Sequence, residues 1–236
     1  MKAEDLRALV ESRGQKYSEI LGIDISEGKE EEIFKWFLAS LLFGAPITES
    51  SVVKTYRCFQ KHGVLAPSQI LETGWDDLVK ILDEGSYTRY DFKTADKLLE
   101  VARNLTEKYS GSLCLIHSES SDAHDFENRL KNLGKGVGDV TVSIFLRELR
   151  DVWEKADPNP TALVVLAAQE LGIVKNDATA EEASEQLKAF WARNKVRRKS
   201  FVNFETALVR LGKSSRRKKK HNLPLVNSGY SGRTAP

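Results

Sequence analysis

The chain has 236 residues, of which 41% are hydrophobic and 30% are charged, an ordinary composition for a soluble globular protein. A chain of this length can bury a sizeable core, as one large domain or two small ones. The net charge of +2 hides an asymmetry: residues 193–236 hold 13 Lys and Arg and one acid, Glu205, so they carry +12 and the preceding 192 residues carry −10. This basic end predicts a polyanionic partner, and a tail that only aids solubility is the alternative.

Several classes of protein are excluded. The longest apolar run, residues 33–43, contains a lysine and is too short to span a bilayer. Charged residues among the first seven interrupt any apolar start, so no signal peptide is predicted. Two cysteines, Cys58 and Cys114, cannot hold a four-cysteine iron–sulfur cluster, and the four histidines lack the spacing of zinc ligands. We therefore expect an intracellular, cytoplasmic and nucleoid-associated protein without metal or cofactor.

Hydrophobic spacing predicts helices along the first half of the chain. The helix at residues 30–43 is the most hydrophobic, and because it is apolar on nearly every side we expect it to be buried. Trp36, within it, is interpreted as a core residue, with stacking on a base as the alternative role. Helices are predicted at residues 1–22, 30–43, 49–62, 75–82 and 93–109, with a short one beginning at Pro67.

A short stretch before the helix at residues 93–109 has residue types suited to nucleic acid. Residues 85–90 read Gly-Ser-Tyr-Thr-Arg-Tyr. Tyr87 and Tyr90 can stack on a base, and Arg89 can meet a phosphate. A turn that is merely covered by two aromatic rings is the alternative.

Two helices joined by a glycine-rich turn come next. Asp122 stands at the N-cap position of the first, and Phe126 and Leu130 lie on its apolar side. This helix stops at residues 134–138, which read Gly-Lys-Gly-Val-Gly, because glycines permit the positive φ values of a tight reversal. A second helix begins after them, and Asp139 can cap it.

This turn has a chemical use. Glycines lack side chains, so a phosphate can approach their amides closely, and those amides point outward at the positive end of a helix. Such a site binds the phosphates of a DNA backbone and does not recognise the base sequence. An ordinary packing corner is the alternative. The candidate DNA contacts are Gly134, Lys135, Gly136, Val137 and Gly138 of the turn, together with Arg89.

The C-terminal part is also helical in pattern. Helices are predicted at residues 161–171, 180–192 and 199–211, and no alternating run of useful length indicates a sheet. From Gly212 onward the basic, polar end is predicted to be disordered.

The turn and the segment after it resemble a known family. Residues 133–138, the helix after them, and Asp157, 19 residues after Gly138, are similar to the helix-hairpin-helix DNA glycosylase superfamily, the endonuclease III-like group. The resemblance runs from about residue 32 to residue 165 and implies a two-lobed all-α fold without the iron–sulfur cluster. It implies two lobes: a terminal lobe of residues 1–34 and 152–212, and a helical barrel module of residues 35–151 that ends in the hairpin. The basic tail at 213–236, predicted to be disordered from its composition, follows them.

The resemblance also implies a reaction. Asp157 matches the essential carboxylate of the family, whose members excise damaged or mismatched bases from double-stranded DNA. Cleavage of an N-glycosidic bond builds positive charge on the sugar, which a carboxylate stabilises, and the same group can activate water. A simple N-cap for the helix near Thr161 is the alternative role of Asp157.

Position 140 decides which kind of glycosylase is expected. Val140 stands where bifunctional members carry a nucleophilic lysine, so we expect a monofunctional enzyme. Two alternatives remain. A non-catalytic DNA-binding protein with the same fold is favoured by Asp139 beside the turn and by the small Ala45 in the loop that carries a duplex-inserting side chain in the family. A bifunctional enzyme would use Lys135.

Overall fold

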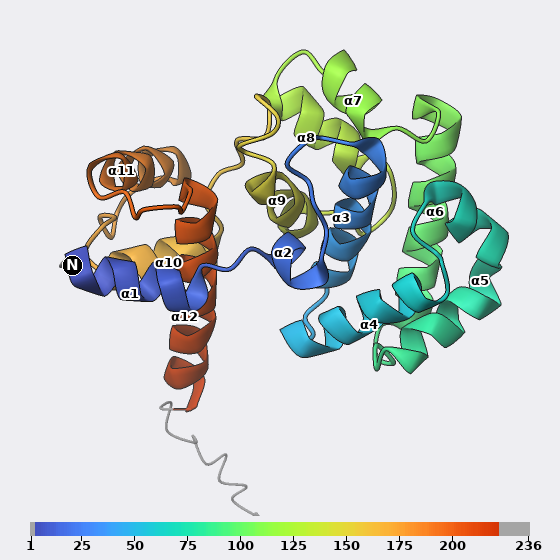
Figure 1. Cartoon of the computed structure of the whole chain (residues 1–236), viewed down its shortest axis with the longest axis horizontal. Coiled ribbons are helices and arrows are strands. Elements are labelled where there is room, and N and C mark those ends of the chain that lie inside the picture. Colours follow the sequence, from blue (N-terminus) through green and yellow to red (C-terminus); the bar gives the residue numbers. More distant parts are fainter. Residues whose placement is uncertain (1–2, 222–236) are drawn as a thin grey trace, which may run out of the picture.

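The computed structural model describes residues 3–221, with side chains up to residue 218, and within that range all regular structure is α-helical. The all-α fold class is thereby confirmed. Figure 1 shows two groups of helices lying side by side. The helices are α1 (Ala3–Arg13), α2 (Tyr17–Leu21), α3 (Glu30–Phe43), α4 (Glu49–Lys61), α5 (Pro67–Glu84), α6 (Asp91–Tyr109), α7 (Leu113–Glu119), α8 (Ala123–Lys131), α9 (Asp139–Glu148), α10 (Ala162–Glu170), α11 (Ala180–Arg193) and α12 (Phe201–His221).

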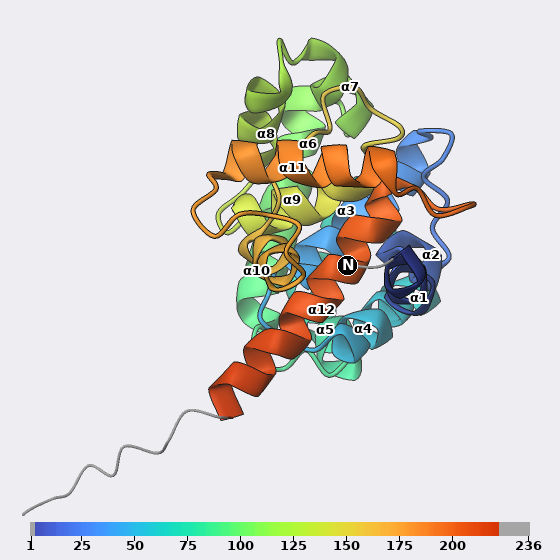
Figure 2. The ribbon, with the colours of Figure 1, turned by 90° about the vertical axis from the view of Figure 1, so that its left-hand side faces the viewer.

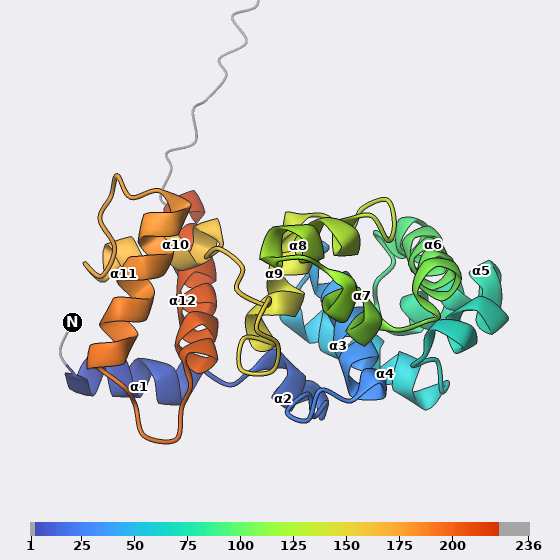
Figure 3. The same ribbon diagram turned by 90° about the horizontal axis from the view of Figure 1, so that it is seen from above.

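Two separate hydrophobic cores account for the two groups. One core gathers apolar side chains of α2 to α9, and the other gathers those of α1 and α10 to α12. We call these groups the larger lobe and the smaller lobe. The chain crosses between them at residues 14–16 and again after Ala156, along the blue and yellow connections of Figures 1 and 3.

These boundaries differ from the expected ones. Residues 17–34 were expected in the terminal lobe, yet Tyr17 and Phe34 are buried in the core of the larger lobe. Trp153 belongs to the same core, so the second crossing lies beyond residue 152. The reason is α3: a helix that is apolar on every side must be enclosed by neighbours, and the segment that leads into it is drawn into the same lobe.

The centre of the larger lobe is α3. Nine of its 14 residues are buried. Trp36 is fully buried, and its indole Nε1 donates a hydrogen bond to the Phe145 carbonyl of α9 at 3.0 Å. The interpretation of Trp36 as a core residue is confirmed, and its alternative role in stacking on a base is wrong.

The first half of the chain differs from the expected elements in two places, at residues 1–22 and before α8. Residues 1–22 form two helices, α1 and α2, rather than one. The two helices predicted after Pro67 are confirmed: they lie within α5 on either side of Gly74, a non-helical residue with a φ of 70° and a ψ of 175°. The stretch before α8 contains α7, whose first turn is capped by the Ser112 hydroxyl, which accepts from the Leu115 amide at 2.9 Å.

The predicted disorder from Gly212 onward is wrong for residues 213–221, which continue α12. Gly212 is needed for close packing, because a Cβ there would collide with the Leu163 carbonyl of α10. Beyond it, the Ser214 hydroxyl accepts from Arg13 Nη1 at 3.1 Å. Lys and Arg are good helix formers, so a docked helix propagates through the basic run. The rest of the predicted tail, 222–236, lies outside the described residues.

Candidate active site between the lobes

The turn between α8 and α9 uses its three glycines differently. Gly136 has a φ of 90°, which an L side chain rarely adopts. Gly134 is pressed against α6, since a Cβ there would lie 2.9 Å from Val101 Cγ2. Gly138 has an ordinary extended conformation with open space around it and is the N-cap of α9. Gly138 therefore borders the solvent where a ligand of the helix start would bind.

The start of α9 leaves its first amides open. The Val142 amide bonds to the Gly138 carbonyl at 3.1 Å, and the amides before it belong to the first turn, which has no intrahelical partner. Asp139 was expected to cap this helix, but its carboxylate is 2.6 Å from Lys131 Nζ and caps nothing. An anion can therefore reach these amides. In the turn itself, the Lys135 amide already donates to Glu100 at 2.9 Å.

A cavity of about 420 Å³ lies between the two lobes. The larger lobe contributes Tyr17, the segment 43–46 and one face of α9, and the smaller lobe contributes residues 161–163 and one face of α12. The α9 face consists of Val140, Ile144 and Arg147, spaced i, i+4 and i+7. The cavity thus reaches from the first turn of α9, beside the glycine turn, to its last turn.

Arg147 is the chemically unusual residue of this cavity. Arg147 is only 3% exposed, and neither its Nε nor its Nη2 has a hydrogen-bond partner among the described residues. The hydroxyl of Tyr17 is buried as well and has no partner at ordinary hydrogen-bond distance, although the Glu49 carboxylate interacts with it. Burial, and next the charge of Glu49, raise the pKa of Tyr17 to about 12, so this hydroxyl keeps its proton at neutral pH and can donate.

The charge of the lining is positive. Arg147, Lys213 and Arg216 contribute three cations, and no carboxylate is among the lining residues. Burial lowers the pKa of Lys213, an amine 4.0 Å from the Glu49 carboxylate. The remaining wall is largely apolar, from side chains such as those of Phe43, Ile144, Leu163 and Val209.

Asp157 does not line this cavity. Its carboxylate accepts from Arg150 Nη1 and, at 2.5 Å, from Lys188 Nζ of α11. Arg150 in turn donates to the buried Glu205 at 2.7 Å. The N-cap of α10 is Thr161, so the alternative role of Asp157 as a cap is wrong. Residues 158–162, directly after it, line a hollow of about 380 Å³ that shares Val140 with the cavity.

Of the three aromatic candidates for stacking on a base, Trp36 and Tyr87 are buried and cannot stack. Tyr87 is 1% exposed, and its hydroxyl donates to the Leu42 carbonyl at 2.6 Å, so its predicted stacking role is wrong for the same reason as that of Trp36. Tyr90 is half-buried beneath Arg89, whose guanidinium carbon lies 5.4 Å from the centre of the ring. This pair lies at the surface and does not line the cavity.

The residues that sequence reasoning missed are Tyr17, Arg147 and Lys213. A signal for Arg147 existed: it lies three residues after Ile144 and seven after Val140, so it continues the apolar face that those two residues form on α9. Tyr17 and Lys213 carried no such signal. Tyr17 meets Arg147 inside the larger lobe, where its amide also donates to Glu148 of α9, and Lys213 reaches the cavity through the contact of the lobes.

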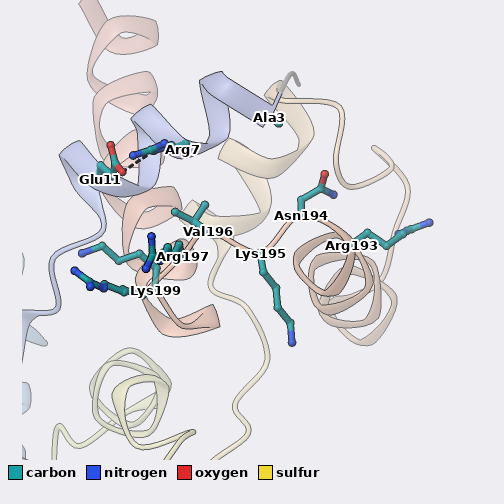
Figure 4. A pocket seen from close by; sticks show the side chains of 10 residues that line it. Ala3, Arg7, Glu11, Arg193, Asn194, Lys195, Val196, Arg197 and Lys199 are labelled. Atoms are coloured by element: carbon teal, nitrogen blue, oxygen red, sulfur yellow. Dashed lines mark hydrogen bonds and ion pairs between the residues drawn. The ribbon is translucent and has the colours of Figure 1, made fainter.

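A second basic hollow, of about 810 Å³, lies on the smaller lobe between α1 and the connection from α11 to α12 (Figure 4). Cations of the segment 193–199 and Arg7 line it; its one lining carboxylate, Glu11, already accepts from Arg7 at 2.8 Å. Figures 2 and 3 show this connection on the side of the molecule away from the end of α12. The hollow adds positive charge to the smaller lobe but is separate from the cavity.

Lys97 lies beneath the glycine turn, and its ammonium donates to the Leu41 carbonyl at 3.0 Å. Burial lowers the pKa of Lys97 from 10.5 to about 8. The folded protein therefore binds fewer protons than the unfolded chain between these values, and stability rises with pH in that window. In Lys97→Met, the free energy of unfolding should lack this rise with pH. In wild type the rise amounts to about 1.4 kcal/mol per unit of difference between the pKa of Lys97 in the unfolded and in the folded state. Urea titrations of both proteins at pH 7.5 and pH 10 measure it; identical pH dependence would contradict the prediction.

Comparison of the chain with protein-family models, with curated proteins and with solved structures found no match. Among residues 3–221, no helix combines the length and the apolar character that crossing a membrane requires. Within the same part of the chain, no three His, Cys, Asp or Glu side chains are grouped so that they could hold a metal ion. The case for function therefore comes from the residues of the cavity and the turn.

Proposed function

We propose that this chain is a DNA glycosylase of the helix-hairpin-helix superfamily, which hydrolyses the N-glycosidic bond of a damaged or mismatched base in double-stranded DNA. One observation carries the proposal: the cavity between the lobes reaches the first turn of α9 at Val140, directly after the open amides that follow Gly138. An enzyme that acts on a base inside a duplex must hold the backbone and the extruded base at once. A single helix can serve both tasks here.

Binding to the DNA backbone is supported by two positive features. The first is the open start of α9. The second is the end of α12, which carries Lys213, Arg216, Arg217 and Lys218. Figure 3 shows the turn before α9 and the end of α12 on the same side of the molecule. Contacts of this kind are independent of base sequence and weaken as salt rises.

The catalytic carboxylate of the proposed reaction is Asp157. It directly precedes residues 158–162, which line the hollow beside the cavity. In the reaction it stabilises the cationic sugar and orients the attacking water. Arg150 and Lys188 hold the carboxylate in a defined orientation.

A non-catalytic DNA-binding protein is the second candidate, and the same contacts favour it. A carboxylate engaged by two cations has less negative potential to offer to a sugar cation. In that case Asp157 links the connection between the lobes to α11, and the open amides of α9 bind DNA without chemistry.

We expect the protein to leave abasic sites that break only after alkali treatment. A lyase step requires an amine that forms a Schiff base with the sugar, and Val140 has none. The measurement is denaturing electrophoresis of a panel of single-lesion duplexes before and after alkali, with borohydride present in a parallel reaction. No covalent adduct should be trapped.

Two amines provide the controls for this expectation. Lys213 is the amine among the lining residues, and Lys135 is exposed in the turn. An adduct that disappears in Lys213→Gln or in Lys135→Ala would replace the monofunctional assignment with a lyase. Duplexes that are bound but never become sensitive to alkali would favour the non-catalytic candidate.

A further inference from the structure

Residues 193–199, from the last residue of α11 into its connection to α12, concentrate positive charge. They read Arg-Asn-Lys-Val-Arg-Arg-Lys, so five of the seven side chains are cations. None of these five cations has an ion-pair partner in the part of the chain that the structure describes. Like charges at this density repel one another, and an anion from outside the chain would relieve that repulsion.

The connection that carries these cations has a fixed backbone. Val196, near its centre, is only 8% exposed and belongs to the core of the smaller lobe, and its carbonyl accepts from the Lys199 amide at 3.1 Å. Arg198 has a φ of 61°, which is uncommon for a residue other than glycine. Asn203 of α12 ties the far end to the first connection between the lobes, because its Nδ2 donates to the Gly14 carbonyl at 2.7 Å. A ligand of the cations would therefore order little of the backbone when it binds.

The arrangement of the cations suits an extended ligand. They border the hollow of about 810 Å³ between the connection and α1. Figure 4 shows them spread along the connection: Arg193 and Lys195 point in different directions, and Arg197 and Lys199 lie on the side of Glu11. A single phosphate ion would need donors that converge on one point, so this surface fits an anion that carries several charges along its length.

The lining distinguishes between the kinds of extended anion. Only Ala3 and Val196 among the ten lining residues have apolar side chains, and none of the ten is aromatic. A protein partner is usually anchored by apolar or aromatic side chains at the centre of the interface. A bilayer is flat on this scale and does not fill a hollow. The convex sugar-phosphate backbone of a nucleic acid fits a concave surface, and guanidinium groups bind its phosphates through paired hydrogen bonds.

We propose that this hollow binds the phosphate backbone of a nucleic acid at a site separate from the start of α9. The connection lies on the side of the molecule away from the end of α12 (Figures 2 and 3), so a straight duplex on the glycine turn and the end of α12 does not reach it. The hollow therefore holds a second segment of backbone. No reaction is required at this site, so the site is independent of the proposed excision.

The first arm of the test removes charge from the hollow. Lys195→Gln combined with Arg197→Gln takes away one lysine and one arginine, both exposed, so we expect the Tm to be unchanged. Arg103→Gln combined with Lys108→Gln, at two exposed cations of α6, is the matched control pair. Both pairs are introduced into Gly138→Glu, in which the start of α9 is blocked.

Binding of a short labelled duplex to these proteins is measured by fluorescence anisotropy at several salt concentrations. We expect the pair in the hollow to lower affinity roughly 10-fold and to make the slope of log K against log salt shallower by about two, and the control pair to change both far less. Equal effects of the two pairs would overturn the proposal.

The second arm locates the contact in wild type. The amines of Lys195 and Lys199 are acetylated with and without duplex at about 1 mM, above the Kd usual for binding without sequence preference, and mass spectrometry follows each site. We expect duplex to slow acetylation of both amines several-fold, in wild type and in Gly138→Glu alike, and to leave Lys108 unaffected. Absence of protection would overturn the proposal, and protection that is lost in Gly138→Glu would show that the hollow is not a separate site.

Polyglutamate at the same concentration of charge and vesicles of phosphatidylserine are the competing ligands in this arm. Protection of Lys195 by either of them that equals protection by duplex would overturn the assignment to nucleic acid. The outcomes also separate this site from the proposed function. Protection of Lys195 without excision of any lesion leaves the hollow standing and removes the glycosylase assignment, and excision without protection does the reverse.

Discussion

Gly138→Glu should weaken binding to DNA of any sequence on the order of a hundredfold, the equivalent of about 3 kcal/mol. The new carboxylate would stand at the open amides of α9, where a phosphate is expected to bind, and would repel it. Fluorescence anisotropy with a labelled duplex, at several salt concentrations, measures the loss. The dependence of affinity on salt should become shallower, because fewer phosphates are neutralised.

Gly138 is the right position for this test because its neighbours in the turn are unsuitable. A side chain at Gly136 would be strained by a φ of 90°, and one at Gly134 would press against Val101. At Gly138 a Cβ meets nothing within 4 Å. The matched control is Gly138→Gln, which has the same size and the same poor capping ability without the charge. Equal affinities of the Glu and Gln variants would mean that the turn is only a packing corner.

Asp157→Asn should lower the rate of base excision by something on the order of a hundredfold or more, with DNA binding retained. The substitution keeps the size of the side chain and removes the charge that stabilises a cationic sugar. Single-turnover excision with enzyme in excess isolates this step from product release. The variant should fold, because Asp157 is 50% exposed and a half-exposed ion pair contributes only about 0–1 kcal/mol to stability.

Lys188→Met provides the control, because it removes one of the two ion pairs of Asp157 and leaves the carboxylate and its pair with Arg150 in place. If Asp157 acts on the sugar, this variant should keep most of the excision rate. An equal loss of excision in both variants would make Asp157 a positioning residue that holds α11 against the connection between the lobes. Undiminished excision by Asp157→Asn would remove Asp157 from the reaction altogether.

Local patterns predicted much of this structure. The helix at residues 30–43 was placed at the bounds of α3, because its apolar residues and flanking turn residues are local signals. Asp122 caps α8 as expected, its carboxylate accepting from the Asp125 amide at 2.8 Å. The glycine turn was also predictable, because a tight reversal requires a positive φ, which Gly136 adopts without strain.

Contacts distant in sequence decided the rest. Tyr87 looks like a surface aromatic in its own stretch, yet the approach of α3 buries it against Leu42. The basic run after Gly212 looks disordered by composition, yet docking against α10 and Arg13 continues it as a helix.

Most of the helices and the glycine turn followed from local sequence, because both depend on the spacing of neighbouring residues. The candidate site was decided by the tertiary structure. Tyr17 and Arg147 are 130 residues apart, and Lys213 is a further 66 residues along the chain. Their meeting depends on the packing of α2 with α9 inside the larger lobe and on the position of α12 across the contact of the lobes. Periodicity identifies which face of a helix is buried, but it carries no information about which distant helix will cover that face.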